Sequence, residues 1–189
     1  MNTIHKVGVI HGRFQGLHKG HLEYLLEGKK RCEKLIIGIT NYTGNEKNEH
    51  ISKIDTHRLN TSDNPFTFYE RLEMIRAALL AEGINEEEFR IVPFPIEEPA
   101  QIPNFVPLNA VFFITIYDDW GREKLKTLNS LGLSVEVMWE RSLEQKPISG
   151  SLLRKKISSG EEWEYLVPSA VATYIKENDL CKKVTGNYK

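Results

Sequence analysis

The sequence is poor in cysteine and in long apolar runs. Its two cysteines, Cys32 and Cys181, are too few for a disulfide scaffold and lack the CxxC spacing of a metal knuckle. The longest apolar stretch, Ala110 to Tyr117, is far shorter than the roughly 20 residues that a membrane helix needs. The N-terminus also lacks a charged segment followed by an apolar one. We therefore expect a cytoplasmic protein with reduced cysteines and no membrane partner.

The chain also lacks an excess of charge of either sign. Its 25 Lys and Arg residues nearly balance its 26 Asp and Glu residues, which gives a formal net charge of −1. Without a basic field or stripe, nucleic acid is not an expected partner, and any bound anion must be held by a local site. The length of 189 residues and the 40% hydrophobic content predict a single domain over residues 1–189 with its own core.

Strand-like and helix-like segments alternate along the chain. Short β-branched and apolar runs predict strands over 6–12, 34–40, 89–93, 110–116 and 134–138. Apolar residues in helical spacing predict helices over 19–32, 67–82, 120–131, 151–158 and after Pro168. This alternation predicts an α/β fold with a doubly wound parallel sheet over 1–147, followed by a helical C-terminal segment over 148–189.

Two segments have the spacing of a helix capping box, and one long segment has no periodicity. Thr67 to Glu70 predicts the start of the helix over 67–82, and Ser159 to Glu162 predicts a further helix start. Residues 41–64 are polar and aperiodic, and they are longer than most structureless loops. A lid over substrate, an oligomer contact and a disordered insert are all consistent with that loop.

Glycines, basic residues and histidines are concentrated in one stretch between the first strand and the first helix. It reads Gly12-Arg13-Phe14-Gln15-Gly16-Leu17-His18-Lys19-Gly20-His21. Glycines let the backbone approach a ligand closely, and the first turn of a helix offers free N–H groups and a positive dipole end. The stretch matches neither a Walker A loop nor a GxGxxG fingerprint. It predicts a third kind of polyphosphate-binding turn.

A second anion site is predicted at the start of the helix over 151–158. Ser149, Gly150 and Ser151 stand at this helix start, and Arg154 follows one turn later. An anion on the free N–H groups would meet two hydroxyl groups and a planar guanidinium. Two such helix starts that faced one cleft would hold a triphosphate from both ends.

These segments resemble the nucleotidyltransferase superfamily that carries the HxGH signature. The signature reads His18-Lys19-Gly20-His21, and the preceding Gly12-Arg13-Phe14-Gln15 is similar to the archaeal-type nicotinamide-mononucleotide adenylyltransferases. Further similarity to that family follows in order at Asn64-Pro65-Phe66-Thr67 with Glu70-Arg71, at 148–154 and at 160–168. The resemblance implies a Rossmann-like fold, Mg²⁺, ATP and a nucleoside monophosphate. It also implies a homo-oligomer, an expectation that rests on the resemblance alone.

The resemblance implies direct in-line attack of a mononucleotide 5′-phosphate on the α-phosphorus of ATP, with release of pyrophosphate. Because such transfers depend on alignment and charge neutralisation, the expected catalytic residues are hydrogen-bond donors: Arg13, His18, His21 and Arg154. Eight more residues are expected to bind the ATP phosphates: Gly12, Phe14, Gln15, Lys19, Gly20, Ser149, Gly150 and Ser151. Mg²⁺ is expected to be held mainly by phosphate oxygens and water.

Other interpretations of these residues remain open. His18 and His21 also fit a surface pair or half a metal site, and Arg154 fits a solvated helix residue. Asp118 and Asp119 fit either a helix cap or a contact with base, ribose or metal. With Trp120, which would stack on a ring or pack in the core, and Phe94, they form the candidate acceptor or base pocket.

The sequence departs from the family where the acceptor is bound. Gly16 and Leu17 stand where the family usually has proline, which we expect to loosen the turn. No tryptophan occurs over 96–103, and residues 117–121 stand where the family has a Gly-Asn type turn. The resulting prediction is an adenylyltransferase that makes NAD⁺ or its deamido form from ATP and nicotinamide or nicotinate mononucleotide. The rivals are a related nucleotidyltransferase with another phosphorylated acceptor, such as a cytidylyltransferase, and a non-catalytic nucleotide sensor.

Overall fold

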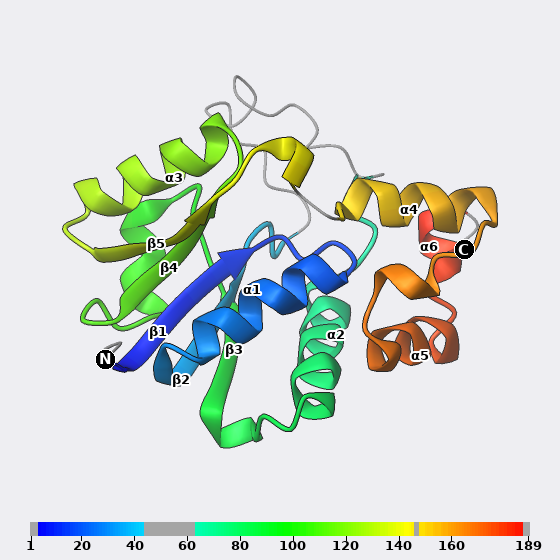
Figure 1. Ribbon diagram of the computed structural model, residues 1–189, viewed down its shortest axis with the longest axis horizontal. Helices are drawn as coiled ribbons and strands as arrows, with labels where there is room; N and C mark the ends of the chain where they lie inside the picture. The colour runs from blue at the N-terminus through cyan, green and yellow to red at the C-terminus, as the bar shows by residue number, and fades with distance from the viewer. Residues whose placement is uncertain (1–3, 44–62, 146–147, 187–189) are drawn as a thin grey trace. The chain divides into compact units, whose positions relative to one another are not determined.

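Five parallel strands form one sheet in the computed structural model, which describes residues 4–43, 63–145 and 148–186 (Figure 1). The strands are β1 (His5–Gly12), β2 (Cys32–Ile39), β3 (Phe89–Pro93), β4 (Val111–Ile116) and β5 (Ser134–Glu140). Their order is β3-β2-β1-β4-β5, and every neighbouring pair is parallel. The predicted α/β fold with a doubly wound sheet is confirmed. Most of the predicted loop over 41–64 lies outside the described residues.

The first five helices lie where they were predicted, and the short α6 was not predicted. They are α1 (Lys19–Lys29), α2 (Phe68–Ala81), α3 (Asp119–Ser130), α4 (Gly150–Ser159), α5 (Ser169–Glu177) and α6 (Cys181–Val184). The predicted first helix ran on to residue 32, but Cys32 already belongs to β2. In the described part of the chain, no helix combines the length and apolar character needed to cross a membrane.

The chain forms two compact units that alternate along the sequence. The sheet unit comprises Met1–Arg13, Tyr24–Tyr42 and Glu86–Pro147, and the helical unit comprises Phe14–Glu23, Thr43–Asn85 and Ile148–Lys189. All five strands and α3 belong to the sheet unit, whereas α2, α4, α5 and α6 belong to the helical unit. The first residues of α1 belong to the helical unit and the rest of α1 to the sheet unit.

The sheet unit has an apolar core in which strands contribute nearly continuous apolar runs. Such runs are typical of parallel strands that are covered on both faces. Phe94 packs so closely on Gly38 of β2 that a Cβ atom there would lie 2.6 Å from Cβ of Phe94. Strand order reverses between β1 and β4, and ligands of such sheets bind beyond the carboxyl ends of the strands at this point.

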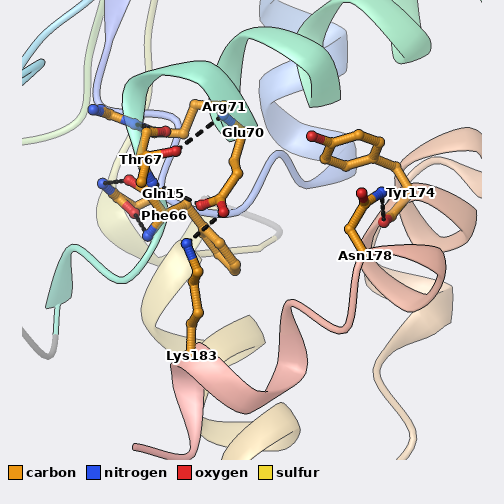
Figure 2. A network of polar contacts seen from close by, with 8 residues as sticks. All are labelled: Gln15, Phe66, Thr67, Glu70, Arg71, Tyr174, Asn178 and Lys183. Carbon is orange, nitrogen blue, oxygen red and sulfur yellow. Dashed lines mark hydrogen bonds and ion pairs between the residues drawn. The ribbon is translucent and has the colours of Figure 1, made fainter. Parts of the chain in front are cut away.

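The helical unit confirms one predicted capping box. Thr67 precedes α2 and accepts the main-chain N–H of Glu70 at 3.2 Å, while the Glu70 carboxylate accepts the N–H of Thr67 at 2.8 Å. Glu70 also forms an ion pair with Lys183 in α6 (Figure 2). The contact ties the start of α2 to the last helix of the unit.

The second predicted capping box, Ser159 to Glu162, is instead the end of a helix. Ser159 is the last residue of α4, and Gly160 follows with φ of 70°. Glycine adopts this left-handed conformation without the steric penalty of a side chain, which makes it the usual residue after a helix end. Ser159 donates its hydroxyl to the Lys155 carbonyl at 3.1 Å. The serine therefore caps no new helix.

The burial of Cys32 makes a testable prediction about thiol reactivity. Its side chain is 2% exposed, and burial raises the pKa of the thiol to about 11. About one thiol in a thousand is then ionised at pH 8, and only the thiolate reacts with alkylating agents. In a Cys181→Ser variant, which leaves Cys32 as the single thiol, we expect iodoacetamide labelling only after denaturant is added. Rapid labelling of the native variant, followed by mass spectrometry, would contradict this burial.

Candidate functional site

His18 caps the helix that carries His21. The main-chain N–H of His21 lies 2.9 Å from the His18 carbonyl oxygen and 3.2 Å from Nδ1 of the His18 ring. Because Nδ1 accepts this N–H, the proton of the neutral ring is on Nε2. His18, which is 3% exposed, is therefore oriented as a hydrogen-bond donor through Nε2.

The two signature histidines stack on each other. Their ring centroids are 3.7 Å apart with an interplanar angle of 17°. Phe14 packs its ring edge against His21 at 5.1 Å, and its φ of 50° is rare for a bulky residue. Such strain persists only where the surrounding structure holds it, and it is common at functional sites. The turn thus holds the imidazole pair from one side.

Gly16 makes the turn tight, although the absence of proline was expected to loosen it. Its φ is 82°, which proline cannot adopt because its ring fixes φ near −65°. A Cβ atom on Gly16 would lie 2.7 Å from Cδ2 of Leu153 in α4. The missing side chain lets the turn pack directly on α4.

The start of α4 lies beside the start of α1 within the helical unit. Ser149 caps α4 by accepting the main-chain N–H of Leu152 at 3.2 Å. A Cβ atom on Gly150 would lie 3.0 Å from the carbonyl oxygen of Gln15, and one on Gly20 would lie 3.9 Å from the carbonyl oxygen of Ile148. Both predicted phosphate-binding helix starts therefore share one unit, as a joint anion site requires.

Arg154 is held at this junction by three acceptors from separate segments. Nη1 donates to the Gln15 carbonyl at 3.2 Å, and Nη2 donates to Asp63 Oδ1 at 2.7 Å and to Ser151 Oγ at 3.4 Å. Only 8% of the side chain is exposed. Arg154 is therefore not a solvated helix residue.

Gln15 connects the turn to the start of α2. Its amide donates to the Phe66 carbonyl and accepts the Phe66 N–H, both at 3.0 Å (Figure 2). The amide was predicted to bind phosphate, and the structure places it on the Phe66 backbone. Since the Gln15 carbonyl also accepts Arg154, this residue links three segments of the helical unit.

Replacing Gln15 with alanine should destabilise the protein by about 1–3 kcal/mol. The change leaves a buried N–H and a buried carbonyl of Phe66 without these partners, and unmade buried hydrogen bonds cost free energy on this scale. Urea unfolding measures the change. Gln101→Ala is the matched control because the Gln101 side chain accepts an exposed hydrogen bond from the Asn104 side chain, which water can replace. Equal stability of the two variants would contradict the role assigned to Gln15.

Lys19, the first residue of α1, lies in the helical unit, whereas Gly12, Arg13 and the residues of the predicted acceptor pocket lie in the sheet unit. Gly12 and Arg13 stand at the end of β1. A pocket of about 330 Å³ lies beyond β4 and β5, and it is lined by Ile116, Tyr117, Asp118, Asp119, Arg122, Glu140, Arg141, Ser142 and Gln145. Asp118 also caps α3 by accepting the N–H of Gly121 at 2.9 Å. Trp120 is not in this lining, and Phe94 is fully buried in the core.

Sequence reasoning missed the aromatic support of this pocket. Trp139 donates from Nε1 to the Tyr117 hydroxyl at 2.9 Å, and the guanidinium of Arg141 lies 4.5 Å from the Trp139 ring centroid. A bulge in β5 places Trp139 opposite Thr115, and bulges commonly redirect side chains near active sites. Because the predicted strand ended at residue 138, the sequence did not indicate that Trp139 pairs with Thr115.

The protein side chains alone do not supply a metal cage in the described ranges. No group of three His, Cys, Asp or Glu residues there lies close enough to hold a metal ion.

Comparison with known proteins identifies the family. The model of the cytidylyltransferase-like family matches residues 9–156. The chain is 47% identical over 177 residues to a phosphonoformate cytidylyltransferase of Streptomyces viridochromogenes, covering 94% of both chains. It is 31% identical to a nicotinamide-nucleotide adenylyltransferase of Thermococcus onnurineus, covering 91% of this chain and 83% of that one.

Solved structures support the fold. The chain matches a bifunctional NMN adenylyltransferase/ADP ribose pyrophosphatase from Francisella tularensis, solved with AMP and a manganese ion, with a TM-score of 0.67 and 16% identity. The match covers 97% of this chain, which spans about half the length of that protein.

These findings correct the predicted substrates. The prediction of nicotinamide- or nicotinate-mononucleotide adenylyltransferase is wrong, because a cytidylyltransferase is 47% identical to this chain whereas such adenylyltransferases are only about 30% identical. The coarser prediction of a nucleotidyltransferase holds, and members of this family typically use a divalent metal. The chain belongs to the cytidylyltransferase-like family of nucleotidyltransferases with the HxGH signature.

Proposed function

We propose that this protein is a cytidylyltransferase that joins the cytidylyl group of CTP to a small phosphonate such as phosphonoformate. The observation that carries the proposal is the 47% identity, over 94% of both chains, to a phosphonoformate cytidylyltransferase. An acceptor oxygen attacks the α-phosphorus of CTP and forms a new P–O bond. The bond from the α-phosphorus to the bridging oxygen breaks, and pyrophosphate leaves with the electron pair.

The residues at the two helix starts are suited to neutralising the charge of this transfer. His18 and His21 donate hydrogen bonds to the α-phosphate and the leaving pyrophosphate, and Arg154 binds the β- and γ-phosphates. The starts of α1 and α4 add main-chain N–H groups and the positive ends of two helix dipoles. Preorganised donors of this kind are usually the largest contribution to catalysis of charge-developing steps.

The remaining predicted residues take supporting roles in the proposal. Arg13 steers the acceptor, and the exposed Lys19 adds positive charge near the phosphates. Mg²⁺ enters as part of the CTP substrate, held mainly by phosphate oxygens and water. The pocket with Asp118 and Asp119 is the candidate site for the base or the acceptor.

A substrate matrix tests the proposal. The protein is incubated with Mg²⁺, each of the four nucleoside triphosphates, and a panel of acceptors: phosphonoformate, phosphonoacetate, and nicotinamide and nicotinate mononucleotides. Pyrophosphate release and product mass are then measured. We expect a cytidylylated phosphonate from CTP and no dinucleotide from ATP. Preferred use of another nucleotide, or pyrophosphate release only with the mononucleotides, would refute it.

A further inference from the structure

Arg154, which the proposed function assigns to phosphate binding, forms an ion pair with the carboxylate of Asp63 in this structure. Asp63 Oδ1 lies 2.7 Å from Nη2 of Arg154, and the two side chains are 23% and 8% exposed. The other acceptors on this guanidinium, the Gln15 carbonyl and the Ser151 hydroxyl, are uncharged. Within the described residues, Asp63 is therefore the charged group among the three acceptors of Arg154.

We propose that Asp63 is an internal ligand of the anion site, which an incoming polyphosphate displaces from Arg154. This inference rests on the proposed function only in that Arg154 binds phosphate. A carboxylate and a phosphate both accept hydrogen bonds from a guanidinium in the same planar fashion. Asp63 thus takes the place of a phosphate oxygen in the protein without ligand.

The contacts of Nη2 explain why a phosphate that binds this nitrogen displaces Asp63. A guanidinium has five N–H groups, and both hydrogens on Nη2 are used by Asp63 and Ser151. A phosphate oxygen on Nη2 must therefore replace one of them. The polyphosphate repels the negative carboxylate and not the neutral hydroxyl. Asp63 is also partly exposed, so water can solvate its carboxylate after it leaves Arg154.

Displacement has a distinctive thermodynamic signature. Asp63 stabilises the protein without ligand, but it lowers the fraction of molecules in which Arg154 is available. Apparent affinity falls in proportion to that fraction. Removing the carboxylate should therefore make the free protein less stable and, at the same time, make it bind polyphosphate more tightly. A residue that merely supports Arg154 would weaken both.

Asp63→Asn in the full chain tests this signature with inorganic pyrophosphate as the probe. By calorimetry we expect pyrophosphate to bind about five- to tenfold more tightly than to wild type. The melting temperature without ligand should fall, and the rise that pyrophosphate produces should grow. Asp179→Asn is the control, because Asp179 is an exposed aspartate whose carboxylate forms an ion pair with the neighbouring Lys182 and not with Arg154. This control should bind pyrophosphate as wild type does.

A double variant shows whether the effect acts through Arg154. In an Arg154→Ala background, Asp63→Asn should no longer tighten binding. Tightening of the same size in both backgrounds would mean that the charge acts directly on the ligand, and it would overturn the proposal. Weaker binding in Asp63→Asn would also overturn it. If the weakening occurs only with Mg²⁺ present, it would assign Asp63 to the metal.

The pyrophosphate assay keeps this inference separate from the choice of substrates. It needs neither CTP nor a phosphonate, so failure of the substrate matrix would leave the result for Asp63 intact. The opposite result is also possible. If the wild-type protein transfers cytidylyl groups but Asp63→Asn binds pyrophosphate no more tightly than wild type does, the proposed function is supported and the role of Asp63 is overturned.

Discussion

Replacing His18 with asparagine should lower turnover by about 10²–10³ and leave thermal stability close to wild type. Asparagine is among the best helix-capping residues, so its side-chain oxygen can accept the His21 N–H that Nδ1 now accepts. Its amide is shorter than the imidazole ring, so its NH₂ group does not reach the position from which Nε2 of His18 donates. The substitution therefore separates the two tasks of one side chain, the capping of α1 and the donation to phosphate.

His18→Ala should lose both tasks. The missing cap costs about 0.5–2 kcal/mol of stability, in addition to the loss of turnover. Turnover is measured as pyrophosphate release with the substrates that the matrix identifies, and stability as the melting temperature. If His18→Asn kept turnover within about threefold of wild type, His18 would be a structural cap and the phosphate role would fall to His21.

The elements that carry the sheet could be predicted from the sequence because burial dictates their composition. β1, β2 and β4 are buried on both faces and have few polar residues. The helices have apolar residues at helical spacing, and Thr67 and Glu70 satisfy each other's N–H groups within four residues. Each of these signals is local. Their positions were accordingly right, with errors of a few residues at the ends.

The features that could not be predicted depend on contacts between distant residues. Nothing near Gln15 indicates that its amide binds Phe66, 51 residues away, and nothing near Arg154 indicates a partner at Asp63. The end of α4 was misread because a serine followed by glutamates fits a helix start locally. The left-handed conformation of Gly160 ends α4 at this point instead.

The substrate error has a physical reason as well. The histidines, the glycines and the serine-rich start of α4 are the residues that we expect to bind phosphates, and phosphate binding is common to transfers from any nucleoside triphosphate. Base and acceptor are selected elsewhere, and at Gly16 and 117–121 the sequence already departed from the adenylyltransferases. Those departures showed where the prediction was weak. The phosphate motifs could not distinguish between the rival substrates.

Arg154→Lys should lower turnover by about 10²–10³ although it keeps the positive charge. The planar guanidinium bonds Gln15, Asp63 and Ser151 at once and sits at the start of α4, where a phosphate would meet it. A lysine supplies one ammonium with no fixed fork, so it cannot hold these neighbours and a phosphate oxygen in the same geometry. Loss of one preorganised donor typically has an effect of this size.

The neighbouring Lys155 provides the matched control on the same helix. Its side chain is exposed, and Lys155→Ala removes a positive charge without touching the Gln15 and Asp63 contacts. We expect Lys155→Ala to keep turnover within about twofold, because exposed charges are well screened. If Arg154→Lys retained wild-type turnover, or if Arg154→Ala and Lys155→Ala lost turnover equally, general positive charge rather than the guanidinium geometry would account for phosphate binding, and Arg154 would have no specific role in the transfer.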